Sequence, residues 1–178
     1  MIYKLIAVVS KDGFIGRYSG DLPVNWTSSE EQNFFKKDIK DCIWSVMGRV
    51  THELSYNEYK KRIIFSSSVK KYEYINKNHI YFNPNSLSFD QIIELIKPVS
   101  KICILGGTKI YDYFIINNLL NDLVITVEPI IFGKGLPLFS KINWNEFPKL
   151  FIENCFKLKS LVEQINNKGT KYYYLSKI

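Results

Sequence analysis

Short apolar runs alternate with helical patterns along most of this 178-residue chain. Buried strands are expected at residues 2–9, 43–47, 62–67, 79–82, 101–105 and 122–132, and helices at 29–40, 48–56, 88–97 and 109–120. Strands that alternate with helices form a parallel sheet covered on both faces. The sequence therefore predicts one α/β domain over residues 1–178, with a mainly parallel central sheet. An Asn/Gly turn signal at 166–169, between two β-rich runs, adds a C-terminal antiparallel hairpin at the edge.

Composition limits the functional classes. Hydrophobic residues make up 46% and charged residues 23%, as in ordinary globular proteins, and no apolar run is long enough to span a bilayer. The N-terminal stretch "MIYKLIAVVS" lacks a secretory cleavage pattern, so we expect a cytoplasmic protein without a membrane role. The net charge of +7 comes from dispersed residues with no basic block, so no nucleic-acid partner is expected.

The three cysteines, Cys42, Cys103 and Cys155, are far apart in sequence and have apolar neighbours. This pattern is typical of buried, reduced thiols that pack as small hydrophobes. It predicts neither a disulfide framework nor a metal site.

Two strand-to-helix turns carry residues suited to phosphate. In "VMGRVTHE", Gly48 stands at the turn, followed by the cation of Arg49 and the hydroxyl of Thr51. In "ILGGTKIY", two glycines precede a helix that Thr108 can cap. Backbone N–H groups at such turns bind phosphates, so a dinucleotide is one interpretation. The alternative for Gly106 and Gly107 is an ordinary tight turn.

Two serines extend this pattern. Ser66 and Ser67 follow the strand "RIIF" and offer hydroxyl donors for a ribose 2′-phosphate, although serines at a strand end are commonly ordinary loop residues. Three polar clusters at strand ends of one sheet favour NADPH over NADH.

One acidic residue on the first helix is a candidate proton donor. In "TSSEEQNFFKK", Glu31 shares a helix face with Phe34 and Phe35, so its carboxyl group would look into an apolar pocket. Burial would raise its pKa toward neutrality. Glu30 is the rival, and both residues also fit a charged first turn favoured by the helix dipole. Trp26 is then a pocket wall or a core aromatic.

Four motifs, "IAVVSKDGFIG", "MGRVTHE", "ILGGTKIYDYF" and "LVITVEP", resemble in order and spacing those of the dihydrofolate reductase family. The resemblance covers nearly the whole chain. It implies a dihydrofolate reductase-like fold and an NADPH-dependent oxidoreductase that reduces 7,8-dihydrofolate to tetrahydrofolate. In that reaction hydride passes from nicotinamide C4 to pterin C6, and N5 is protonated.

The resemblance also implies roles for individual residues. On the substrate side Glu31 takes the place of the family's acidic residue, with Trp26 and Thr126 beside it. The residues expected to contact substrate are Val8, Glu31, Phe35, Lys60, Ile104 and Thr126. Those expected at the cofactor are Ile15, Gly16, Gly48, Arg49, Thr51, Ser66, Ser67, Gly106, Gly107, Thr108, Lys109 and Tyr111. The segment Lys11 to Leu22, with three glycines, is expected to close over the site as a lid.

Three departures leave alternatives open. Lys60 or Lys61 stands where the family has an arginine for the folate carboxylate, and Val24 follows the Pro where many members have Trp. The segment "VEPIIFGKGLPLF" resembles thermophile dihydrofolate reductases, some of them dimeric, and also the reductase domain of riboflavin synthesis. The alternatives are therefore a reductase of a phosphorylated ribosylaminopyrimidinone, and a non-catalytic binding module with the same fold. A homodimer contact through this segment stays open.

Overall fold

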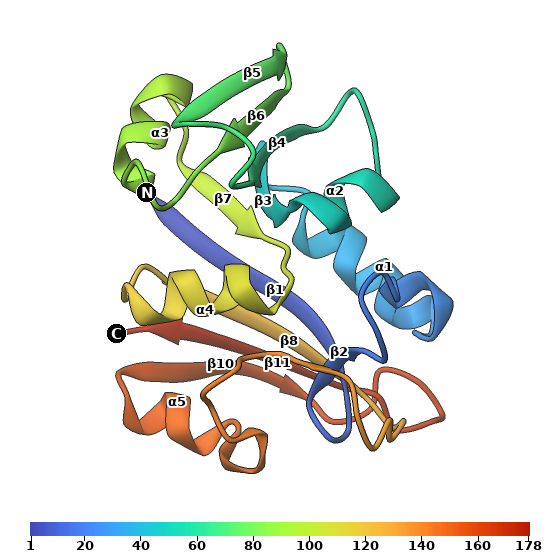
Figure 1. Cartoon of the computed structure of the whole chain (residues 1–178). Helices are drawn as coiled ribbons and strands as arrows, with labels where there is room; N and C mark the ends of the chain where they lie inside the picture. The colour runs from blue at the N-terminus through green and yellow to red at the C-terminus, as the bar shows by residue number, and fades with distance from the viewer.

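A nine-stranded sheet forms the centre of the computed structural model, which describes residues 1–178 (Figure 1). Its strands lie in the order β10, β11, β8, β1, β7, β3, β4, β6 and β5. Their bounds are β1 Ile2–Ser10, β3 Trp44–Gly48, β4 Lys61–Phe65, β5 Tyr72–Asn76, β6 His79–Phe82, β7 Lys101–Ile104, β8 Asp122–Glu128, β10 Phe156–Val162 and β11 Lys171–Lys177. A separate small pair joins β2 Phe14–Gly16 to β9 Leu136–Pro137.

The six inner strands from β8 to β6 are parallel, as predicted. Strand β1 lies between β7 and β8 and is buried from Tyr3 to Ser10, since helices and loops cover both of its faces. The predicted C-terminal hairpin forms the antiparallel edge β11–β10. The opposite edge is also antiparallel, because β5 pairs with β6.

Helices cover both faces of the sheet. Their bounds are α1 Ser29–Asp38, α2 Arg49–Leu54, α3 Phe89–Ile96, α4 Thr108–Ile116 and α5 Lys149–Glu153, with short 3₁₀ turns at Pro23–Asn25 and Trp144–Glu146. Phe89 of α3 and Phe114 of α4 pack with Leu5 in the main core, whereas Phe34 and Phe35 of α1 pack on the other face around Ile6. None of these helices has the length and apolar character needed to cross a membrane.

Several sequence expectations differ from the structure. The predicted strand at 122–132 ends at Glu128, because Pro129 has no N–H for the sheet ladder. The predicted helix at 109–120 ends at Ile116, and the one at 29–40 ends at Asp38. Strand β5 was not predicted, because all its residues but the last are exposed and it lacks an apolar run.

The cysteine prediction was wrong for all three residues, since two are joined by a disulfide and the third is not buried. Cys42 and Cys103 form a disulfide, with their Cα atoms 5.7 Å apart, while Cys155 is free and exposed. The register of β3 against β7 sets Ser45 beside Cys103, which brings Cys42, just ahead of β3, within reach. A separation of 61 residues gave no local signal of this contact.

Candidate active site

A large crevice opens where the parallel strands end and has a volume of about 1550 Å³. Its wall combines residues from β1, α1, the β3–α2 turn, the end of β4 and the β7–α4 turn. The predicted site residues that line it are Val8, Ile15, Glu31, Phe35, Gly48, Arg49, Thr51, Lys60, Ser66, Ser67, Gly106, Gly107, Thr108, Lys109 and Tyr111. Residues predicted for the substrate side and for the cofactor side thus share one space.

The remaining four predicted residues do not line this crevice. Thr126 is buried on β8 beside Val8 and makes no hydrogen bond to Glu31, whereas the main chain of Ile104 lies inside the core on β7. Gly16 pairs with Leu136 in the small β2–β9 sheet. Trp26 packs edge-on against the ring of Phe132, and its buried Nε1 has no protein acceptor.

The two phosphate-type turns are joined to each other. The backbone N–H of Gly48 donates to the carbonyl of Gly106 over 2.9 Å. Because β3 and β7 are parallel neighbours, their carboxyl ends present both turns at one edge of the sheet.

The twin glycines have different reasons for being glycine. Gly106 has a φ of +94°, and a Cβ there would lie 2.8 Å from the hydroxyl of Tyr111. Tyr111 is buried and donates to the carbonyl of Ile6 over 3.0 Å, so it cannot move aside freely. Gly107, joined to Gly106 by a cis peptide bond, leaves room, since a Cβ there would meet only Ile15 at 3.6 Å. The open position faces the crevice at the start of α4.

Thr108 does not cap α4. Gly107 is the N-cap residue, and the Thr108 hydroxyl donates instead to the carbonyl of Pro137. The first N–H groups of α4 are therefore left without a side-chain cap at the crevice, which is the arrangement that binds anions at helix N-termini.

Glu31 faces inward and its neighbour Glu30 faces solvent. Ser28 caps α1 and accepts the backbone N–H of Glu31 over 3.2 Å, which fixes the first turn. The Glu31 side chain is only 4% exposed. Burial raises its pKa to about 7, a hydrogen bond from Thr27 opposes that rise, and the charges of Glu128 and Asp38 add to it. Glu31 can therefore bind and release a proton near neutrality.

Arg62 also lines the crevice, although the sequence analysis assigned it no role. It is 6% exposed and has no carboxylate partner. Its two Nη atoms donate to the carbonyls of His52 and Ser55 at the end of α2, while its Nε has no acceptor. An arginine at the start of an apolar strand, as in "RIIF", was the available signal.

The predicted lid is anchored in its first half. The Asp12 carboxylate accepts from Ser10 and from the backbone N–H groups of Phe132 and Gly133. Gly13 lies so close to Trp144 that a Cβ there would come within 2.2 Å of the indole ring. Gly13 also has a φ of +86°, so both its backbone conformation and this close packing require glycine.

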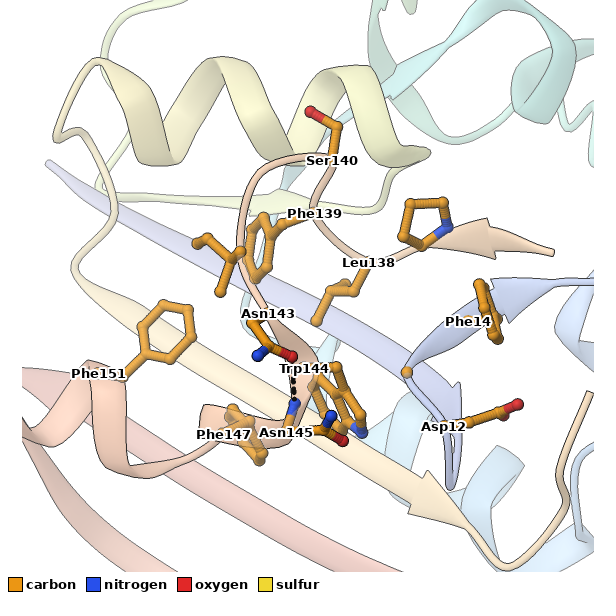
Figure 2. A pocket seen from close by; sticks show the side chains of 13 residues that line it. Asp12, Phe14, Leu138, Phe139, Ser140, Asn143, Trp144, Asn145, Phe147 and Phe151 are labelled. Carbon is orange, nitrogen blue, oxygen red and sulfur yellow. Dashed lines mark hydrogen bonds between the residues drawn. The ribbon is translucent and has the colours of Figure 1, made fainter. Parts of the chain in front are cut away.

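This contact borders a second, smaller pocket of about 300 Å³ (Figure 2). Figure 2 shows Trp144 beside the loop at Asp12. Phe139, Phe147 and Phe151 lie on the side of Trp144 that is away from Asp12. The indole Nε1 donates to the carbonyl of Lys11, and the Asn143 side chain accepts from the N–H of Asn145. These polar groups are satisfied within the protein, and seven of the 13 residues that line the pocket are hydrophobic.

A comparison with known protein families finds one whose model matches most of the chain. The family model for dihydrofolate reductase matches residues 2–159. The chain belongs to the dihydrofolate reductase family. This membership confirms the resemblance found in the sequence motifs, and it places the chain in a family of oxidoreductases.

Two solved structures share the fold of this family member. A putative riboflavin biosynthesis protein from Shewanella sp. PV-4 superposes with a TM-score of 0.69 at 17% identity, covering 100% of this chain and 99% of the other. The dihydrofolate reductase of Enterococcus faecalis, complexed with NADP(H) and RAB-propyl, also gives 0.69 at 19% identity, covering 99% and 96%. Among curated proteins, the uncharacterized protein YwjB of Bacillus subtilis (strain 168) is 25% identical over 149 residues, which is 78% of this chain and 82% of YwjB.

Proposed function

We propose that the chain reduces 7,8-dihydrofolate to tetrahydrofolate with NADPH. The observation that supports this proposal is the Glu31 carboxyl group, buried with a pKa of about 7 in the same crevice as the Gly106–Gly107 turn. A reduction that adds a hydride and a proton to one C=N bond needs a proton source beside the hydride donor.

The cofactor side has the donor set that NADPH requires. Arg49 and Lys109 supply cations, the hydroxyls of Ser66 and Ser67 lie at the end of β4, and Gly107 leaves the helix start open. These residues would hold the 2′-phosphate and the pyrophosphate. When bound, NADPH supplies a hydride from C4 of its nicotinamide ring.

On the substrate side, Glu31 would accept hydrogen bonds from the pterin amino group and ring nitrogen and support protonation at N5. Phe35 and Val8 line the same part of the crevice wall and offer apolar surface for a flat ring. Their packing against the ring would exclude water, which strengthens the interactions of the Glu31 carboxyl.

A specific observation favours a second substrate class. Lys60, Lys61 and Arg62 all line the crevice where a substrate tail would lie, and the Shewanella protein of the same fold carries a riboflavin-biosynthesis name. Lysine lacks the planar fork that matches a carboxylate, but it binds a phosphate well. The second candidate is therefore NADPH-dependent reduction of a phosphorylated ribosylaminopyrimidinone.

Absorbance at 340 nm tests both candidates in one experiment. Purified protein is mixed with NADPH and either dihydrofolate or the phosphorylated pyrimidine, and with NADH as the cofactor control. The proposal expects NADPH loss with dihydrofolate, and a large preference over NADH that Arg49→Ala diminishes. Oxidation with the pyrimidine alone would transfer the assignment to the second candidate, and no oxidation with either would leave a binding module.

The sequence predicts a cytoplasmic location, on which the proposed reaction does not depend. Disulfides are uncommon in a reducing compartment, so the Cys42–Cys103 bond argues against that location. Whether the protein forms a homodimer through the segment that resembles dimeric relatives stays open. Ile131 and Leu136 of the segment that resembles dimeric relatives are exposed, whereas Leu138 and Phe139 are buried in the core.

A further inference from the structure

Glu128 is a buried carboxylate that the proposed chemistry does not use. It ends β8 and is 2% exposed. One carboxylate oxygen accepts from both the backbone N–H and the hydroxyl of Ser28, each over 2.8 Å. The other oxygen accepts from the hydroxyl of Thr170, over 2.6 Å. Three donors on its two oxygens hold this buried carboxylate in one orientation, and it forms no salt bridge.

These bonds connect Glu128 to the first turn of α1. Ser28 is the N-cap residue of that helix, and its Oγ accepts the backbone N–H of Glu31. Glu128 therefore fixes Ser28, and Ser28 fixes the turn that carries Glu31. The positive end of the α1 dipole lies at this turn and favours a negative charge there.

The other side of Glu128 is closed by the connection between β10 and β11. The hydroxyl of Thr170, besides donating to Glu128, accepts from the side-chain amide of Asn166 over 2.8 Å. Thr170 itself is fully buried. The β10–β11 connection therefore keeps solvent away from this side of the Glu128 carboxylate.

The remaining charges around Glu31 are compensated or solvated. Asp38, on the same helix, is paired with Lys4 of β1 at 3.1 Å and also accepts from Tyr172 of β11. Asp21, in the loop that lines the crevice, is paired with Arg17 at 2.7 Å. Glu30 is exposed, and Lys36 lies farther along the crevice wall. Glu128 is the like charge near Glu31 that has no ion-pair partner.

We propose that Glu128 is a positioning residue that fixes the first turn of α1 through Ser28 and places a negative charge behind the turn that carries Glu31. The link to turnover rests on the proposed function. The link to the proton affinity of Glu31 does not, because it can be measured without substrate or cofactor.

The test compares Glu128→Gln with Glu128→Asp. Gln keeps the length of the side chain and one acceptor oxygen, but it replaces the other oxygen with an NH2 donor and removes the charge. Asp keeps the charge and both oxygens but shortens the reach to Ser28. The carboxyl carbon of Glu31 is followed by ¹³C NMR in protein labelled at glutamate, assigned by its loss in Glu31→Gln. Glu30→Gln is the matched control, since it removes the adjacent but solvated charge.

We expect Glu128→Gln to lower the pKa of Glu31 by about 0.5 or more, and Glu30→Gln to change it by less than about 0.2. Glu128→Asp should leave the titration close to that of the wild type and lower kcat for NADPH-dependent reduction several-fold, with a smaller effect on KM. A merely structural role would give the same Glu31 titration in both Glu128 variants.

An unchanged Glu31 titration in folded Glu128→Gln would overturn the proposal. If that variant does not fold, Glu128→Asp carries the test, and an unchanged kcat there would overturn the positioning role. If the wild type reduces no dihydrofolate, the proposed function fails, while the NMR titration still decides the role of Glu128.

Discussion

The buried position of Glu31 lowers the stability of the protein near neutral pH. Its pKa is about 7 in the folded protein against 4.5 for an ordinary glutamate. Between these values the unfolded chain releases the proton and the folded chain keeps it. The folded state therefore binds more protons, and Glu31 makes the free energy of unfolding fall as pH rises from about 4.5 to about 7.

Glu31→Gln should remove this loss. Relative to the wild type, the variant should gain on the order of 1–3 kcal/mol of unfolding free energy between pH 4.5 and pH 8. Urea denaturation of both proteins at the two pH values measures the difference, with Glu30→Gln as the exposed control. An equal change in all three proteins would mean that Glu31 titrates as an ordinary surface acid.

His52 has the opposite effect on the acid side. It is buried beside His79, and its Nδ1 lies 3.2 Å from Nη1 of Arg62. Burial, then His79 and Arg62, lower its pKa from 6.5 to about 4. Because the unfolded chain takes up the proton first, His52 makes stability fall as pH drops from about 6.5 to 4.

A side chain that does not take up a proton at this position should weaken the loss of stability at low pH. Gln can still accept from Arg62, so His52→Gln should lose less stability than the wild type between pH 6.5 and pH 4, by on the order of 2 kcal/mol. Thermal unfolding followed by circular dichroism across this range gives the comparison. Parallel pH curves for the two proteins would show that His52 does not drive acid unfolding.

At the scale of single elements, the sequence was sufficient wherever one run of residues decides the structure. The apolar run of β1, the charged first turn of α1 and the glycine turn before α4 are local signals, and each predicted element formed there. Helical spacing left Glu30 as a rival, and the resemblance to the family selected Glu31. The structure buries Glu31 and exposes Glu30. Strand β5 gave no such signal, because its exposed residues form a strand only by pairing with β6.

Contacts between distant elements could not be predicted in this way. Arg62 caps the carbonyls at the end of α2, and Glu128 reaches Ser28 across 100 residues of sequence. Glu128 was assigned to the interior of a long strand, although Pro129 ends that strand and frees the side chain for α1. Roles of this kind depend on the register of the sheet, which periodicity does not reveal.

The Cys42–Cys103 disulfide joins the segment before β3 to β7 and closes a loop with a sequence separation of 61 residues. In the chain-entropy model, a cross-link that closes a loop of this length stabilises a protein by about 4 kcal/mol, because it lowers the entropy of the unfolded chain. Reduction with dithiothreitol should lower the midpoint of urea unfolding accordingly, and Cys42→Ser should reproduce the effect. Cys155→Ser is the control because Cys155 is free and exposed. Equal unfolding midpoints with and without reductant would mean that the bond adds no stability.

At the scale of the whole molecule, the sheet order explains why the buried Glu31 and the Gly106–Gly107 turn share one crevice. Strand β1 lies at the centre, α1 follows it on one face, and β7 beside it ends in the Gly106–Gly107 turn (Figure 1). Parallel strands bring their carboxyl ends to the same edge, so residues 75 positions apart line one crevice. The disulfide, the Gly48–Gly106 hydrogen bond and the anchored loop at Gly13 hold this edge in place.

The most direct test of this arrangement is the pH dependence of dihydrofolate reduction in a single turnover, followed at 340 nm with saturating NADPH. If protonated Glu31 supports the reaction, the wild-type rate should fall above pH about 7, by about tenfold for each further pH unit. Glu31→Gln should be slow at neutral pH and lack this dependence. A wild-type rate that stays constant from pH 6 to pH 9, or a Glu31→Gln variant as fast as the wild type at pH 7, would contradict the role of Glu31 and with it the proposed reaction.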